Sequence, residues 1–296
     1  MIDFVKVRIL DTEEVFNNLK YGNIKYYSKS NDVNLCDVNS LNDLYGTEFI
    51  LDENRYLKLK VYKNECIYLE GSIHSYLKGS NNNDFSVVEI HKSINLIEKL
   101  LFTSAENLKL TQFEFGINVN WVDCFKFLDF QFIGYDLKEF NRITNPTKKV
   151  KLLKEVSISN GLRFKIYCKD EDLLRIEIRI KNASFKSYQK RFCNINLSQL
   201  SEFEYLNLLK NKFMECFEKL MIIDLKQLKQ YPEKLTPQYW KFLKEGKVKG
   251  ELCESTYYNN RSKFYKDYIN NDSLSKDKSI IRKLIELKFV NLLILK

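Results

Sequence analysis

Apolar and polar residues alternate in several stretches over the first two thirds of the chain. The pattern occurs in "DFVKVRIL", "YLKLKVY", "CIYLEGS", "LKLTQFEFGINVN", "LRFKIYCK" and "LLRIEIRI". Because successive side chains of a strand point to opposite faces, this period predicts half-buried β-strands. Short polar turns at residues 63–64, 160–161 and 170–172 separate pairs of these stretches, so they predict antiparallel hairpins.

Helical periodicity appears in other parts of the chain. "SVVEIHKSINLIEKLLF" has a capping box of Ser86 and Glu89, "VDCFKFLD" predicts a short helix, and residues 197–223 predict a long helix that begins near Ser198. After the proline-containing "KQLKQYPEKLTP", three further helical segments follow. We therefore predict an α+β fold, an antiparallel sheet with flanking helices plus a helical C-terminal region, divided into residues 1–230 and 231–296.

Composition and charge narrow the choice of partner and compartment. The net charge of the 296-residue chain is +9, which favours an anionic partner, with nucleic acid before a membrane surface. The seven cysteines are scattered, form no CxxC pair and follow no signal peptide, so we expect reduced thiols and a cytoplasmic protein. No apolar run is long enough to span a membrane, and we expect no membrane partner.

The hairpin around residues 170–172 carries the chemistry that stands out. Residues two apart on a strand share a face, so Tyr167 and Lys169 point the same way, as do Arg175, Glu177 and Arg179. Pairing across the turn brings Tyr167 within one cross-strand neighbour of Arg175 or Glu177.

A third strand can add a second carboxylate to this face. Glu114 lies between Phe113 and Phe115, and therefore on the opposite face from them. Two carboxylates on one face could hold Mg²⁺ or Mn²⁺, which prefer oxygen ligands. A tyrosine beside such a cation could attack a phosphodiester, with lysine and arginine steadying the charge that develops. The alternative is a solvated strand face with cross-strand ion pairs and a packing tyrosine.

Two other parts of the chain each allow two interpretations. His74, at the end of the "CIYLEGS" strand, is either a metal ligand or phosphate contact, or a capping or surface residue. In the tail, Arg261 and Lys263 lie among tyrosines, which suits either contact with a DNA backbone or a helix packed on the body.

The order of these motifs resembles the gene II/X family of phage and plasmid replication proteins, the rolling-circle initiators of filamentous phages. The likeness rests on "MIDFVKVRI", "VYKNECIYLEGSIHSYLKGSNNNDF", "TQFEFGINVN", "LRFKIYCK" and "LLRIEIRIK", which occur in the family's order over residues 1–181. The chain departs from the family in one loop, where Ser80 stands at the position of the initiators' histidine.

The resemblance implies an HUH/replication-initiator-like nuclease body that nicks and rejoins single-stranded DNA through a 5′-phosphotyrosine intermediate. It implies that Tyr167 is the nucleophile, with Lys169 beside it, and that Glu114 and Glu177 bind Mg²⁺ or Mn²⁺. The implied DNA contacts are those of Arg175 and Asn81. To these the strand pattern adds Arg179, and the tail adds Arg261 and Lys263. The expected partners are single-stranded or supercoiled DNA at a replication origin and replication proteins of a bacterial host cell. The protein would act in the cytoplasm of that cell.

Three alternatives remain open. A relaxase or transposase of a mobile element would use the same chemistry and differ only in its DNA substrate. A basic DNA-binding protein with a vestigial site, or an RNA-binding module that stacks bases on sheet aromatics, would perform no chemistry.

Overall fold

The computed structural model describes residues 1–30, 33–135, 138–139, 141–143, 153–159, 161–181, 195–224 and 276–294. The strands are β1 (Ile2–Ile9), β2 (Ser28–Lys29), β3 (Glu48–Ile50), β4 (Leu57–Tyr62), β5 (Cys66–Ser72), β6 (Leu108–Asn120), β7 (Gln131–Tyr135), β8 (Lys138–Glu139), β9 (Asn141–Ile143), β10 (Leu153–Ser159), β11 (Leu162–Asp170), β12 (Leu173–Lys181) and β13 (Leu220–Asp224). The α-helices are α1 (Thr12–Lys20), α2 (Ile73–Lys78), α3 (Val87–Leu101), α4 (Cys124–Phe130), α6 (Phe203–Glu218) and α10 (Lys276–Leu293).

A long antiparallel sheet organises the described residues. Its strand order is β2-β3-β4-β5-β1-β6-β12-β11-β10-β9, and a second sheet has the order β13-β7-β8. The predicted turns are confirmed, because β4 pairs with β5, β10 with β11, and β11 with β12. The mixed α+β class and the antiparallel sheet with flanking helices are thus observed, and β6, β12 and β11 lie side by side.

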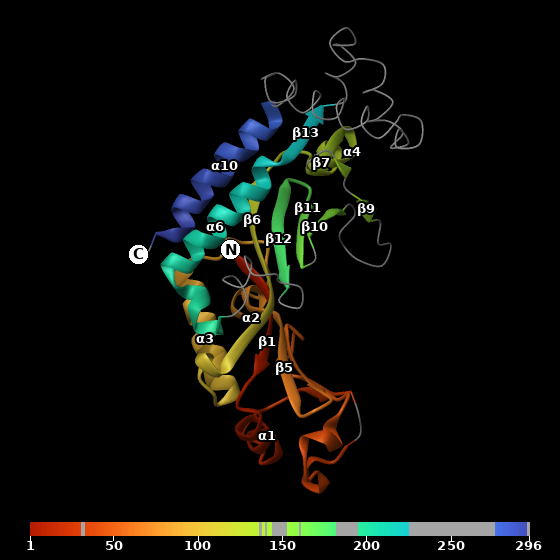
Figure 1. Cartoon of the computed structure of the whole chain (residues 1–296), viewed down its shortest axis with the longest axis vertical. Helices are drawn as coiled ribbons and strands as arrows, with labels where there is room; N and C mark the ends of the chain where they lie inside the picture. The colour runs from red at the N-terminus through yellow and green to blue at the C-terminus, as the bar shows by residue number, and fades with distance from the viewer. Residues whose placement is uncertain are drawn as a thin grey trace.

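One face of the sheet carries the core, and helices cover it. Figure 1 shows α3, α6 and α10 along one side of the long sheet. Phe213 of α6 and Phe289 of α10 pack against Phe115 of β6, with ring centroids 6.0 and 5.7 Å apart, and Phe213 also contacts Phe164 of β11. The C-terminal helix therefore contributes to the same core as the sheet.

Two predicted helix features have different outcomes. The capping box is confirmed, since the Ser86 side chain and Glu89 bond reciprocally at the start of α3. The single long helix over residues 197–223 is wrong, because a 3₁₀ turn at Leu197–Ser201 precedes α6 and the chain then enters β13. The apolar run that closes this segment suits a buried strand as well as a buried helix, and pairing with β7 decides the outcome.

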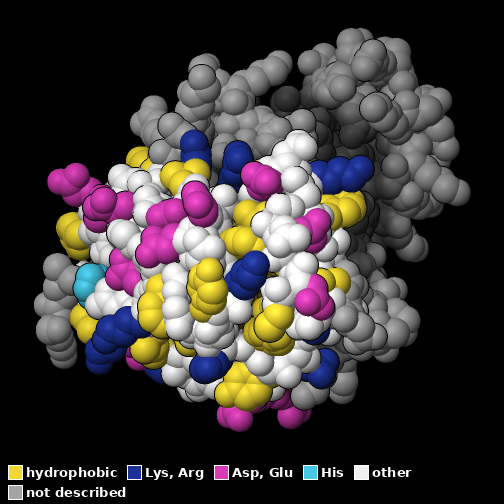
Figure 2. Space-filling model, turned by 90° about the horizontal axis from the view of Figure 1, so that it is seen from below, with side chains coloured by type: hydrophobic (Ala, Val, Ile, Leu, Met, Phe, Trp, Pro, Cys, Tyr) yellow, Lys and Arg dark blue, Asp and Glu magenta, His cyan; other side chains and the backbone are white. Residues whose placement is uncertain are grey.

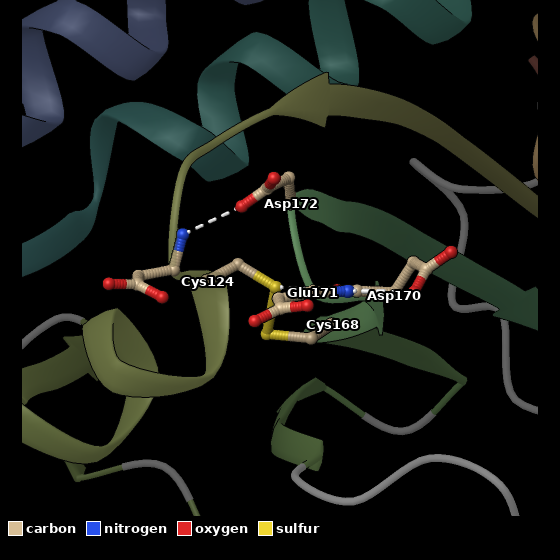
Figure 3. Close-up of a disulfide and its surroundings, with 6 residues drawn as sticks. Cys124, Cys168, Asp170, Glu171 and Asp172 are labelled. Atoms are coloured by element: carbon tan, nitrogen blue, oxygen red, sulfur yellow. Dashed lines mark hydrogen bonds between the residues drawn. A yellow bond between two sulfur atoms is a disulfide. The ribbon is translucent and has the colours of Figure 1, made fainter.

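Cysteine pairing also differs from the prediction. Cys124 at the start of α4 and Cys168 of β11 form a disulfide whose Cα atoms are 5.9 Å apart, so the expectation of reduced thiols is wrong for this pair (Figure 3). The disulfide ties α4 to the strand that carries Tyr167. Beside it, the turn of Asp170, Glu171 and Asp172 and the end of β6 border an open hollow of about 570 Å³.

The surface at the end of the molecule formed by the N-terminal strands has mixed charge. Figure 2 shows acidic side chains gathered on one part of this face, and Lys and Arg side chains scattered between apolar ones. The basic surplus of the sequence does not form one large patch on this face. Among the helices of the described ranges, none is long and apolar enough to cross a lipid bilayer.

A core substitution in α10 tests whether this helix belongs to the body. We expect Phe289→Ala to lower the free energy of unfolding by about 3–4 kcal/mol, because it removes a ring stacked on Phe115 and in edge contact with Phe213. Leu287→Ala is the matched control, since Leu287 of the same helix is 63% exposed. Urea titration of both variants measures the difference, and equal losses would contradict this packing.

Candidate functional site

The polar face of β6, β12 and β11 collects the ionisable residues predicted from the sequence. In register, Tyr167 pairs with Arg175, Lys165 with Glu177, and Arg179 with Glu114. All three strands turn their apolar residues toward the helices, so alternation places these side chains together on the other face. Glu114, Glu177 and Arg175 are buried there.

Tyr167 and Glu177 are in direct contact. The Tyr167 hydroxyl donates to Glu177 Oε2 at 3.2 Å, and Arg175 Nε donates to the same oxygen at 3.1 Å. Burial, and then the charge of Glu177, raise the pKa of Tyr167 well above its ordinary value. Burial alone would raise the pKa of Glu177, but Lys165 and Arg175 outweigh it and hold this pKa at about 2.

Lys165 is a central residue of the cluster that the sequence reasoning missed. Its Nζ donates to Glu114 Oε1 at 2.7 Å and to Glu177 Oε1 at 2.8 Å, so one ammonium bridges both glutamates. Burial would lower the pKa of Lys165, but Glu177 and Glu114 outweigh it and raise the pKa. The sequence carried a signal for this residue, because Lys165 lies two positions before Tyr167 on the same strand face.

Asp3 of β1 is a third carboxylate that was not predicted. It accepts hydrogen bonds from Ser72 Oγ and Asn81 Nδ2, and its Oδ2 lies 3.5 Å from Arg175 Nη2. One carboxylate oxygen each from Asp3, Glu114 and Glu177 lie within 4.8 Å of one another. The cluster thus draws its acidic groups from β1, β6 and β12.

The two arginines predicted to bind DNA differ in exposure. The side chain of Arg175 is 2% exposed, and its Nη1 donates to Asn118 Oδ1 at 3.1 Å, so its contacts lie inside the protein. Arg179 Nε donates to Glu114 at 2.5 Å, and 28% of the Arg179 side chain remains exposed. Of the two arginines, Arg179 is therefore the one whose side chain is accessible to a phosphate group.

A loop over residues 79–85 covers one end of the polar face. Lys169 Nζ and Asn118 Nδ2 both donate to the backbone oxygen of Asn81. Burial, and then the charge of Arg175, lower the pKa of Lys169 to about 7. Asn81 thus contacts the cluster through its amide, bonded to Asp3, and through its backbone, while its side chain remains partly exposed.

Gly116 of β6 is required for the close approach of β12. It pairs with Glu177, and a Cβ at this position would lie 2.5 Å from Glu177 Cβ and 2.6 Å from the Ile176 oxygen. Any larger residue would push the strands apart. The absence of a side chain at Gly116 therefore fixes where the Glu177 carboxylate lies.

His74 lies close to the cluster but outside the group of carboxylates. It is in α2 rather than at a strand end, because Ser72 caps this helix. The ring is 1% exposed, stacks on Phe85 at a centroid distance of 4.4 Å, and has no hydrogen-bond partner at either nitrogen. Burial lowers the pKa of His74 to about 3. Among the described residues, the acidic group that could hold a metal does not include His74.

The buried imidazole predicts a pH dependence of stability. The folded-state pKa of about 3 lies below the ordinary value of about 6.5, so the unfolded chain binds the extra proton. This contribution to stability is complete above pH ~6.5 and is lost at about 1.4 kcal/mol per pH unit as the pH falls toward 3. Urea titrations between pH 7 and 4 should show a shallower decline for His74→Phe than for the wild type. His91→Phe, which changes the exposed histidine of α3, should follow the wild type, and identical slopes for all three would contradict the assignment.

The three carboxylates of the cluster are the groups that a divalent cation would need as ligands. The spacing of Asp3, Glu114 and Glu177 would suit Mg²⁺ or Mn²⁺. However, Lys165 already lies between the two glutamates, while Arg175 and Arg179 pair with the same carboxylates. Three cationic side chains balance three carboxylates, so the cluster in this arrangement does not accommodate an additional cation.

Arg261 and Lys263 lie outside the described residues, as do the first two of the three helical segments predicted after residue 230. The third predicted segment is observed as α10.

The comparisons with known proteins give no match. No family model matches the chain, and neither a curated protein nor a solved structure matches it. The resemblance to the gene II/X initiators stays a prediction.

Proposed function

We propose that this protein nicks and rejoins single-stranded DNA as a rolling-circle replication initiator, with Tyr167 as the nucleophile. One observation carries the proposal. The Tyr167 hydroxyl lies on the polar sheet face, bonded to Glu177 and across the strand pair from Arg175, with Lys169 two residues further along. A phenol placed among cationic groups suits attack on a phosphodiester, whose negative charge grows during the reaction.

The reaction is two transesterifications. The Tyr167 oxygen bonds to phosphorus, the bond from phosphorus to the 3′ oxygen breaks, and the protein keeps the 5′ phosphate while the 3′ hydroxyl primes synthesis. A later attack by a 3′ hydroxyl on the phosphotyrosine reseals the strand and frees the phenol. Bond energy is conserved throughout, so no nucleotide cofactor is consumed.

The phenol proton needs an acceptor, because the pKa of Tyr167 is raised. Glu177 is a poor base, since Lys165 and Arg175 hold its pKa at about 2 against the effect of burial, and its role is to orient the hydroxyl. Lys169 is the proposed acceptor, because it lies two residues from Tyr167 on the same strand face and burial lowers its pKa to about 7. Its Nζ donates to the Asn81 backbone oxygen, so this bond must break before Lys169 takes the proton. The protonated Lys169 then returns the proton to the departing 3′ oxygen. No step above is assigned to Mg²⁺ or Mn²⁺, because Lys165, Arg175 and Arg179 already pair with Glu114 and Glu177.

Covalent capture tests the proposal. The protein is incubated with circular single-stranded DNA and with a single-stranded oligonucleotide library of random sequence, in parallel reactions containing Mn²⁺ or EDTA. We expect a DNA adduct on a denaturing gel, and the adduct should map to the tryptic peptide of residues 166–169, which contains Tyr167. An adduct at another tyrosine, such as Tyr135 or Tyr188, or none with any DNA, would overturn the proposal.

Nucleic-acid binding without chemistry is the second candidate. The observation that favours it is that Glu114, Glu177 and Tyr167 all have hydrogen-bond partners inside the protein. A relaxase or transposase would share the chemistry, and only the DNA substrate separates it from an initiator. Binding of DNA or RNA with no adduct under any of these conditions would support the non-catalytic candidate.

A further inference from the structure

The position between Glu114 and Glu177 is filled by a side chain of the protein itself. Lys165 Nζ lies 2.7 Å from one glutamate oxygen and 2.8 Å from the other, and its side chain is 8% exposed. It reaches this position because Lys165 pairs with Glu177 across β11 and β12, while Gly116 lets β12 approach β6 closely. The ammonium is therefore built into the sheet.

An ammonium and a divalent cation exclude each other at this position. Mg²⁺, Mn²⁺ or Ca²⁺ would need the same glutamate oxygens at roughly 2.0–2.6 Å, closer than the ammonium now lies. A divalent ion would also add two charges to a buried group whose formal charges already cancel, and uncompensated buried charge is costly.

We propose that Lys165 is the resident cation of this cluster, and that it holds Glu114 and Glu177 together in the place where a divalent metal would bind. The intact protein then binds no divalent cation tightly at Asp3, Glu114 and Glu177. One consequence rests on the proposed function. Tyr167 would act without a metal held by these carboxylates, so the DNA adduct would form in EDTA as it does in Mn²⁺.

Removing the ammonium should create a metal site. In Lys165→Met, the ion pairs of Lys165 with Glu114 and Glu177 are lost, so these carboxylates keep only Arg179 and Arg175 as ion-pair partners and space opens between them. We expect this variant to bind Mn²⁺ at least about tenfold more tightly than the wild type, measured by calorimetry and by the loss of the free Mn²⁺ signal in electron paramagnetic resonance. Mn²⁺ should also raise the Tm of the variant and leave that of the wild type unchanged.

Lys60→Met is the matched control. Lys60 of β4 also bridges two glutamates, at 3.2 Å from Glu48 and 2.6 Å from Glu70, but its side chain is 28% exposed. Lys58 also pairs with both of these glutamates, so a cation remains in place after the change. This variant should gain no Mn²⁺ site.

Two results of the Mn²⁺ measurements would contradict the proposed role of Lys165. Tight Mn²⁺ binding by the wild type, or no gain in Lys165→Met, would overturn the inference. Should Lys165→Met fail to fold without metal, Lys165→Gln provides the second variant, because its amide can still donate to one carboxylate. None of these measurements involves DNA, so their failure leaves the covalent-capture test standing, and failure of the capture test leaves the metal measurements valid.

Discussion

Tyr167→Phe is expected to eliminate the covalent DNA adduct, a loss of at least about a thousandfold in nicking rate. The substitution removes only the attacking oxygen and its hydrogen bond to Glu177. Arg175 still donates to the same carboxylate oxygen, and Lys165 to the other, so the cluster keeps its ion pairs. The assay is the same denaturing gel and peptide map, with DNA binding followed separately by fluorescence anisotropy.

Two controls distinguish loss of the nucleophile from loss of DNA binding or of the fold. DNA affinity should stay within about twofold, because the neutral hydroxyl supplies no phosphate contact of its own. Tyr68→Phe changes a partly buried tyrosine of β5 that is paired edge-to-face with Tyr62, and it should form the adduct like the wild type. An adduct retained by Tyr167→Phe would remove Tyr167 from the chemistry, and a parallel loss of DNA binding would show that the substitution disturbs the fold.

The sheet could be predicted from sequence because strand period and turn length are local properties. Alternation decides which side chains share a face, and a short turn fixes the register of a hairpin. The turn at residues 170–172 brings Tyr167 near Arg175 or Glu177, and the irregularity between Cys168 and Asp170 decides that Tyr167 pairs with Arg175. The placement of Glu114 on the same face follows from its position between Phe113 and Phe115, both of which are buried in the core.

Asp3 could not be placed by the same reasoning. Alternation puts Asp3 on the face of Val5 and Val7, which are buried in the core. The pairing of β1 with β6 shifts between Ile2 and Val5, and this irregularity turns Asp3 toward Arg175 instead. A bulge of this kind depends on contacts between distant strands, which the local pattern does not contain.

The balance of charge within the buried cluster could not be predicted from the pattern of each strand taken separately either. The sequence pattern predicted two carboxylates on one face and, from them, a metal site. Lys165 was overlooked because a lysine on a half-buried strand usually points to solvent. Burial of Glu114 and Glu177 changes the role of Lys165, since two buried carboxylates need a cation, and Lys165 of β11 lies within hydrogen-bond distance of both.

Glu177→Leu should cause the largest loss of stability, about 3–5 kcal/mol in the free energy of unfolding measured by urea titration. The change leaves Lys165 and Arg175 buried beside an apolar side chain, and each loses an ion pair of about 3 Å. Glu48→Leu is the matched control. Glu48 also pairs with two lysines, at 3.1 and 3.2 Å, but its side chain is 29% exposed, so this change should cost less than about 1 kcal/mol.

The double variant Glu177→Leu with Lys165→Met distinguishes loss of charge balance from loss of packing. It removes one charge of each sign, so Glu114 keeps Arg179 and Arg175 keeps Asp3. If unpaired buried charge causes the loss, the double variant should be more stable than Glu177→Leu alone, with a coupling of about 1–3 kcal/mol in the thermodynamic cycle. Additive losses would mean that Lys165 and Glu177 contribute independently to the free energy of unfolding. The buried ion pair between them would then not be what holds β11 and β12 in register at the Tyr167 site.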